Sequence, residues 1–358
     1  MLFLIVVLLL AIGVVMVFSS SSVTALRETQ DAYHYLKRQL IAVVLGLVLM
    51  FITMRLNYRI YKRVAILGLA VSFVLLVLVL IIGREVYGSK RWIDLGFMNL
   101  QASEVAKLAL INFAAAYASV KREEMRFWWK GFFPPLALTG AAIILVMLEP
   151  DFGTSIAIMC SVLVVLFAAG ARVLHFVVIG LASIPLAGLL IYLEPYRMER
   201  ILAFIDPWAD PADSGWNVIQ SLLAIGSGGL FGVGLGAGRQ KFFYLPEQHT
   251  DFIFAVLGEE LGFVGTFTVA VLFALLVWRG VRIALYAPDL FGTLLAMGIT
   301  GMIGFQAILN IGVVTGSLPV TGITLPLISY GGSSLVTTLA GIGILLNISQ
   351  AGASSRRN

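Results

Sequence analysis

The chain has 358 residues, of which 60% are hydrophobic and only 12% charged; its net charge is +5 and its mean hydropathy +0.99. This composition excludes a soluble globular domain. With Cys160 as the single cysteine, an intrachain disulfide and a cysteine-based metal site are excluded as well. The isoelectric point near 9.3 would suit a nucleic-acid-binding protein. The basic residues form no patch, however, so we expect no nucleic-acid partner.

Long apolar stretches recur at the length needed to cross a membrane, about 17–25 residues. They predict ten transmembrane helices near residues 1–18, 38–54, 64–83, 103–120, 131–148, 153–169, 174–193, 251–278, 291–312 and 331–349. The first stretch lacks the charged n-region and the cleavage site of a signal peptide, so we interpret it as the first helix. We therefore expect an all-α polytopic membrane protein, organised as a single membrane domain over residues 1–358.

The basic residues sort by membrane side. Loops 55–63, 121–130, 170–173 and 279–290, together with the C-terminal tail that holds Arg356 and Arg357, contain thirteen Lys or Arg and three Asp or Glu. Because cytoplasmic loops are rich in Lys and Arg, we expect these loops and both termini in the cytoplasm. The 57-residue segment 194–250 then forms a long loop on the outer side, between the seventh and eighth helices.

This outer loop ends at Asp251, where the eighth predicted helix begins. From geometry alone, Asp251 is either a helix-capping residue or a catalytic carboxylate, and the sequence favours neither. Glu259 and Glu260 follow inside the apolar stretch, where consecutive acids need cationic or hydrogen-bonding partners. A loop of this length is typical of a functional segment, and its middle is apolar enough to lie on the outer leaflet.

A second polar cluster lies in residues 90–107 and includes Arg91, Trp92 and Gln101. Glu104 and Lys107 are three residues apart, on one face of the fourth predicted helix, and can pair. The pair is equally consistent with a structural ion pair and with a functional one, in which Lys107 offers a point charge to a phosphate.

Two further clusters complete the outer side. Asp151, after Glu149 and Pro150, either caps the sixth helix or contacts a ligand. Residues 310–335, which include Ser329, are rich in Gly, Pro and Thr, and such backbone is tolerated at membrane depth only against protein or a water-filled cavity. Since all four clusters fall on the outer side, we expect one outward-opening site.

Two long motifs resemble the SEDS family of bacterial cell-wall polymerases. The first runs from Tyr244 to Gly262 and the second from Leu325 to Leu335, and the resemblance extends through all ten predicted helices. Ala102 departs from the family pattern, which usually has proline there. The segment 319–322, Pro-Val-Thr-Gly, resembles the branch of the family that serves cell elongation rather than division.

The resemblance implies a peptidoglycan glycosyltransferase that polymerises lipid II at the outer face of the bacterial cytoplasmic membrane during elongation. Asp251 would be the general base of an inverting displacement. The implied substrate-binding residues are Lys107, Glu104, Arg91, Trp92, Gln101, Asp151, Arg200, Glu259 and Ser329. No cofactor is certain, and a divalent cation, Mg²⁺ or Mn²⁺, remains open.

The resemblance also implies partners. These are lipid II, the nascent glycan strand, other proteins of the elongation complex and a class B penicillin-binding protein, which is a transpeptidase. We expect this transpeptidase to contact the 194–250 loop and the eighth and ninth helices, where Gly292, Gly298, Gly301 and Gly304 would allow close approach. A lipid II flippase and a non-catalytic scaffold are the alternatives. The short basic cytoplasmic loops argue against transport, which needs polar access from both faces.

Overall fold

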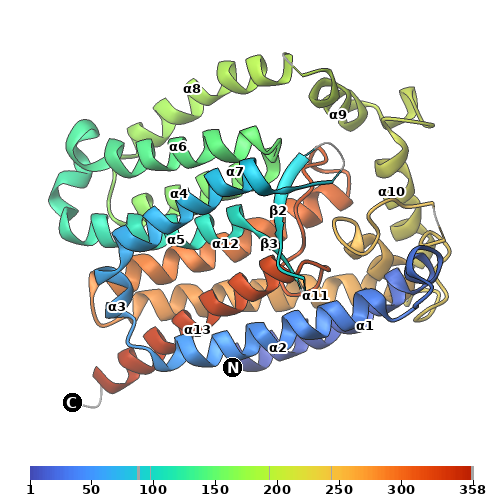
Figure 1. Ribbon diagram of the computed structural model, residues 1–358, viewed down its shortest axis with the longest axis horizontal. Helices are drawn as coiled ribbons and strands as arrows, with labels where there is room; N and C mark the ends of the chain where they lie inside the picture. The colour runs from blue at the N-terminus through green and yellow to red at the C-terminus, as the bar shows by residue number, and fades with distance from the viewer. Residues whose placement is uncertain (87–88, 97, 193, 243, 356–358) are drawn as a thin grey trace.

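The protein is almost entirely helical in a computed structural model that describes residues 1–86, 89–96, 98–192, 194–242 and 244–355 (Figure 1). Its α-helices are α1 (Leu2–Thr29), α2 (His34–Arg55), α3 (Arg59–Arg63), α4 (Ala65–Ile82), α5 (Ala102–Val120), α6 (Phe133–Leu148), α7 (Phe152–Ala168), α8 (Val173–Tyr192), α9 (Pro195–Ile205), α10 (Trp216–Gly228), α11 (Ile253–Leu285), α12 (Leu290–Val314) and α13 (Gly332–Ser355). Short helical turns are η1 (Arg122–Arg126), η2 (Trp128–Phe132) and η3 (Pro207–Ala209). The predicted all-α membrane fold is confirmed.

Each of the ten predicted ranges overlaps one long helix: α1, α2, α4, α5, α6, α7, α8, α11, α12 or α13. In the described part of the chain, seven helical segments are long and apolar enough to cross a membrane, while α7 and the 173–189 part of α8 are apolar but shorter. The chain is therefore a multi-pass membrane protein. Ten as the number of spans, and the orientation of the spans, stay predictions; Arg356 and Arg357 lie outside the described residues.

The central helix of the bundle is α12, which packs against α5, α7 and α11. Four of its glycines serve this packing. Gly298 faces Ile111 and Val165, whereas Gly292, Gly301 and Gly304 face Tyr58, Val164 and Val277, respectively. The expectation that these glycines receive a partner's helix is therefore wrong, because neighbours within the chain already occupy that space. The α12 helix instead uses these glycines to pack against other parts of the same chain.

Connections gather at the two ends of the bundle. The α3 helix and the end of α13 lie at one end in Figure 1, and α9, α10 and the strands lie towards the other. The three strands β1 (Arg84–Val86), β2 (Ser89–Asp94) and β3 (Asn99–Gln101) form an antiparallel sheet in the order β1-β2-β3, with Trp92 opposite Gln101. The sequence analysis did not predict this sheet, nor α9 and α10 within the 194–250 loop.

The largest departure from the predicted bounds is in α1, where polar residues have partners in the bundle. The α1 helix continues past residue 18 to Thr29, and its Ser19 and Ser20 are buried. Ser19 donates to the Glu260 carboxylate at 2.7 Å, and the Gln248 side chain donates to the Ser20 carbonyl at 3.0 Å. Hydropathy alone ends the helix too early, since it cannot register such partners.

The α11 helix is broken at Gly262, where φ is 65°. A regular helix would bond its own main-chain groups there, so the break leaves several without partners. Residues 229–234 bond to them instead, through four main-chain hydrogen bonds of 2.9–3.1 Å with residues 259–264. Part of the outer loop is thereby attached to α11 along its backbone, a few residues after Asp251.

Candidate functional site

Asp251 lies two residues before α11, close enough to Arg200 of α9 and Arg91 of the sheet for their charges to act on it. Phe252 occupies the N-cap position of α11, and no side chain caps that helix. The helix-capping interpretation of Asp251 is therefore not what the structure shows. Its carboxyl group is half-buried and faces the 315–331 segment, where Gly322 approaches it closely.

The backbone around Asp251 is fixed by three residues of the α12–α13 region. The Asn310 side chain donates to the Asp251 carbonyl at 2.7 Å and, with the same amide, to the Ile323 carbonyl at 2.7 Å. Ser329 donates its hydroxyl to the Thr250 carbonyl at 2.6 Å, and the Tyr330 N–H donates to the His249 carbonyl at 2.9 Å. The predicted site residue Ser329 thus holds the loop that carries Asp251.

The charges of the other outer clusters act on Asp251. Burial, followed by the carboxylates of Glu247 and Asp151, raises the pKa of its carboxyl group, and the guanidinium groups of Arg200 and Arg91 lower it; together these effects bring the pKa to about 7. A carboxyl group with a pKa near neutral can accept a proton at physiological pH. The outer clusters predicted from separate parts of the sequence therefore share one electrostatic environment.

Asp151 and its neighbours form the wall contributed by α7 and the sheet. Asp151 caps α7 by accepting from the Thr154 N–H at 3.0 Å, which confirms the predicted cap, and it also accepts from the Gln101 side chain at 3.1 Å. Arg91 donates to the carbonyls of Glu149 and Pro150 at 2.8 and 2.6 Å. The unpredicted sheet thus places Gln101 and Arg91 beside the start of α7.

Arg200 reaches the site from α9. It donates to the Val320 carbonyl at 3.0 Å, and its guanidinium group lies over the Tyr196 ring at 4.3 Å. Guanidinium groups have five N–H donors. The contacts within the described chain use one donor of Arg200 and two of Arg91, so both retain donors for a phosphate.

Glu104 and Lys107 form the predicted ion pair inside α5. The Lys107 Nζ and Glu104 Oε1 atoms are 2.8 Å apart, and the Lys107 side chain has no exposed surface. An intramembrane pair of this kind is costly to open, since either charge alone would be buried without compensation. A direct contact between Lys107 and a substrate would require the pair to separate.

Glu259 and Glu260 are likewise buried, and both attach the outer loop to α11. Glu259 accepts from the main-chain N–H groups of Arg239 and Gln240, at 2.6 and 3.2 Å. Glu260 pairs with Lys241 at 2.7 Å. The sequence analysis correctly required partners for these acids but did not identify Lys241, since nothing local links residues 241 and 260.

Glu149 is a functional candidate that the sequence analysis left unassigned. Its side chain is fully buried, and neither carboxyl oxygen has a hydrogen-bond partner among the described residues. Burial and, to a smaller extent, the Asp151 carboxylate raise its pKa, Arg91 lowers it, and together they bring the pKa to about 8. At neutral pH the group is therefore largely protonated. In the sequence, the signal that could have identified Glu149 is its position directly after an apolar helix.

The described residues contain no group of three or more His, Cys, Asp or Glu side chains placed to hold a metal ion. Asp151 is committed to Thr154 and Gln101, and Glu259 to loop N–H groups. These side chains therefore do not fit a metal site built from protein ligands alone.

Fold and site together define a polytopic membrane protein with a carboxylate-and-arginine site at one end of its bundle. A family model described as a cell cycle protein, FtsW/RodA/SpoVE, matches residues 1–353. The chain belongs to this family, which contains the SEDS proteins suggested by the sequence motifs.

Individual relatives span nearly the whole chain. The stage V sporulation protein E of Bacillus subtilis is 48% identical over 352 residues, which cover 98% of this chain and 96% of that protein. A probable peptidoglycan glycosyltransferase FtsW of Geobacter sp. strain M18 is 45% identical, covering 96% and 94%.

Among solved structures, a chain of a peptidoglycan synthase complex that coordinates polymerization and crosslinking has a TM-score of 0.82 and 36% identity, covering 98% of this chain and 97% of that chain. The rod shape determining protein RodA of Thermus thermophilus has a TM-score of 0.73 and 34% identity, covering 98% and 95%.

Proposed function

We propose that this protein is a peptidoglycan glycosyltransferase that polymerises lipid II into glycan strands at the outer face of the bacterial cytoplasmic membrane. One observation carries the proposal: the Asp251 carboxyl group has a raised pKa, lies on a backbone held by Asn310 and Ser329, and is within range of the charges of Arg91 and Arg200. A base beside cationic groups suits a reaction that removes a proton and releases a pyrophosphate. The relatives named as peptidoglycan glycosyltransferases support this reading.

In the proposed reaction, the 4-hydroxyl oxygen of the acceptor sugar attacks the anomeric carbon of the donor. The hydroxyl proton passes to the Asp251 carboxylate. The bond between the anomeric carbon and the phosphate oxygen breaks, and undecaprenyl pyrophosphate leaves with the electron pair. A single displacement converts an α-linked donor into a β-1,4-linked product, which is inversion. Arg91 and Arg200 stabilise the negative charge on the leaving pyrophosphate.

The remaining predicted residues have supporting roles in this proposal. Asp151 and Gln101, which are hydrogen-bonded to each other at the start of α7, would contact the substrate, as would Trp92, which lies opposite Gln101 on the sheet. Ser329 holds the backbone just before Asp251, and Glu259 holds residues 239–240 of the 194–250 loop. A divalent cation, Mg²⁺ or Mn²⁺, would have to bind through the pyrophosphate itself.

Polymerisation of purified lipid II, measured as glycan chain length on gels, tests the proposal. The Asp251→Asn variant should form no polymer, because the amide keeps the size of the side chain but loses its basicity. Asp289→Asn, which removes the carboxylate that caps α12, is the matched control and should retain activity. Near-normal polymer from Asp251→Asn would eliminate the assigned base. Movement of lipid II across vesicles without polymer would favour the flippase, and neither activity would favour the scaffold.

The branch of the family is a separate question. The segment 319–322 favours a role in elongation, whereas relatives with 45–48% identity are named for sporulation or for FtsW. We retain elongation as the prediction of the sequence motif. Expression in strains that lack the elongation, division or sporulation member decides it: rescue of rod shape alone would support elongation, and rescue of septation or spore cortex alone would contradict it.

A transpeptidase partner is the last part of the proposal. A structurally similar chain works within a complex that coordinates polymerization and crosslinking. The membrane helix of a class B penicillin-binding protein would lie on the exposed side of α11, where Phe263 and Phe267 are 59% and 58% exposed, and its stalk would reach the 194–250 loop. Co-purification, and polymerisation with a partner lacking its transpeptidase serine, test this arrangement. Equal activity with and without the partner would refute activation while leaving Asp251 in place.

A further inference from the structure

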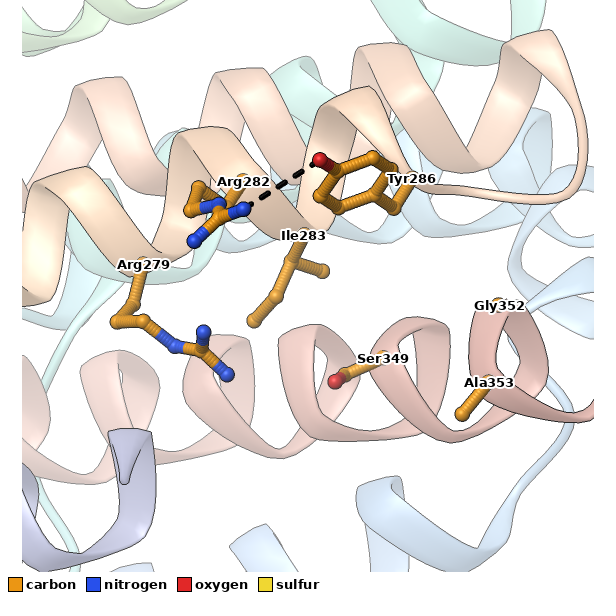
Figure 2. A pocket seen from close by; sticks show the side chains of 7 residues that line it. All are labelled: Arg279, Arg282, Ile283, Tyr286, Ser349, Gly352 and Ala353. Atoms are coloured by element: carbon orange, nitrogen blue, oxygen red, sulfur yellow. Dashed lines mark hydrogen bonds between the residues drawn. The ribbon is translucent and has the colours of Figure 1, made fainter. Parts of the chain in front are cut away.

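A cleft of about 260 Å³ opens between the last turns of α11 and the C-terminal part of α13 (Figure 2). Arg279, Arg282, Ile283 and Tyr286 line it from α11, and Ser349, Gly352 and Ala353 line it from α13. Because Asp251 precedes the other end of the 33-residue α11, the cleft is separate from the candidate catalytic site. The proposed reaction gives it no role.

The two arginines bring positive charge to this cleft without a counter-charge from the protein. Neither Arg279 nor Arg282 forms an ion pair with Asp or Glu in the part of the chain that the structure describes. By contrast, Arg59, at the same end of the bundle, pairs with Asp289 at 3.0 Å. Unneutralised guanidinium groups facing one space favour an anion there.

Aromatic rings, rather than carboxylates, position these guanidinium groups. Arg282 lies over the rings of Trp278 and Tyr286, at 5.2 and 5.5 Å, and donates to the Tyr286 hydroxyl at 3.4 Å. Arg279 extends from α11 towards α13, where the Ser349 hydroxyl lies (Figure 2). Its Nε atom is buried and has no hydrogen-bond partner among the described residues. A buried donor without a partner marks a place where a ligand oxygen would bond.

The surroundings indicate that the anion belongs to a lipid. Trp278 and Tyr286, which flank the cleft, are 46% and 45% exposed, and Leu285 is 71% exposed. Trp and Tyr gather where the membrane meets water, at the level of the lipid headgroups. Apolar side chains beside the cleft provide a surface for acyl chains, whereas a free phosphate would gain nothing from them.

We propose that this cleft binds the phosphodiester of an anionic phospholipid headgroup, with Arg279 and Arg282 as its charged ligands and the Ser349 hydroxyl as a further donor. Such a site differs from the general attraction between basic residues and anionic membranes. It has a defined cavity, two guanidinium groups held against aromatic rings, and one buried donor without a partner among the described residues.

Lipid binding to the purified full-length protein tests the proposal without reference to polymerisation. Native mass spectrometry would follow titrations with phosphatidylglycerol and, separately, with zwitterionic phosphatidylcholine. We expect wild type to prefer phosphatidylglycerol and the Arg279→Gln/Arg282→Gln variant to bind it about 30-fold more weakly. The Arg122→Gln/Arg126→Gln variant loses the same charge from η1 and should bind like wild type, since both side chains are exposed outside the cleft.

A second variant keeps the test decisive if the double arginine variant fails to fold. Ser349→Leu retains both positive charges but fills the cleft from α13, so it should also lose the preference for phosphatidylglycerol. Equal binding by wild type, the Ser349→Leu variant and any folded arginine variant would overturn the site. Displacement of the lipid by millimolar inorganic phosphate would assign the cleft to free phosphate and overturn the lipid assignment.

Discussion

The Asn310 side-chain amide donates to the main-chain carbonyl of Asp251 at 2.7 Å, which links the central helix to the carboxylate-bearing loop. Asn310 is buried, and the same amide donates to the Ile323 carbonyl. One side chain therefore sets the distance between the loop that carries Asp251 and the 315–331 segment. The position of the proposed base therefore depends on α12 as well as on its own helix.

We predict that Asn310→Ala lowers the rate of lipid II polymerisation about 10- to 100-fold, because a displacement of about 1 Å at a catalytic group has this effect. Asn347→Ala is the matched control, since Asn347 likewise donates to a carbonyl, that of Met54, but near the opposite end of the bundle. Both variants should lose similar thermal stability, and only the first should lose activity. Equal activity of the two would remove the positioning role of Asn310.

The raised pKa of Asp251 predicts a pH dependence. A general base acts in its deprotonated form, so activity is lost as pH falls through about 7 and is retained above it. Between pH 6 and pH 8 the polymerisation rate should rise about tenfold. Initial rates across this range, with the folded fraction checked at each pH, measure it. A flat profile, or a rate that falls as pH rises, would contradict the assignment.

Glu104→Gln and Lys107→Met should each reduce activity and stability, because each leaves the other charge buried without a partner. Breaking a buried pair costs about 3–5 kcal/mol. The double variant should regain much of this stability, which thermal unfolding in detergent would show. If the double variant also polymerises lipid II at the full rate, the pair is structural only.

Membrane orientation is open to a labelling experiment. In a Cys160→Ser background, Ala212→Cys should react with an impermeant thiol reagent added to intact cells, because residue 212 is exposed in the outer loop. Glu123→Cys, in η1, should react only after the cells are opened. The reverse pattern would place Asp251 in the cytoplasm and refute extracytoplasmic chemistry.

The long helices could be predicted from the sequence because a hydrocarbon layer demands an apolar run of known length. For Arg91, Asp151 and Asp251, the sequence predicts only that they lie on the same side of the membrane, because the distribution of basic residues among the loops indicates the side of each loop. Their actual arrangement depends on the short sheet at residues 84–101, which has no strong periodicity. The partners of Glu259 and Glu260 depend on long-range contacts, for which a single sequence carries no signal.

For a related reason, the sequence did not predict that Glu149 is buried or that the α12 glycines pack against neighbours in the same chain. A glycine in an apolar helix permits close approach on either side, and the sequence does not say whether the neighbour belongs to the same chain. An acid after an apolar run can face water or protein equally well. The first question is decided by the packing of α5, α7 and α11 around α12, whereas Glu149 is buried at the junction of α6 and α7, where Arg91 of the sheet donates to its carbonyl.

The break at Gly262 has a consequence for engineering this protein. A methyl group at Gly228 or Gly232 would collide with the carbonyl oxygen of Gly258 or Glu260, and one at Gly262 would collide with the main chain of the loop. Since each obstacle is backbone, no second substitution can relieve it. Insertions, tags and fluorophores will therefore be tolerated around exposed Ala212, and rejected between residues 228 and 242 although that stretch also lies in a surface loop.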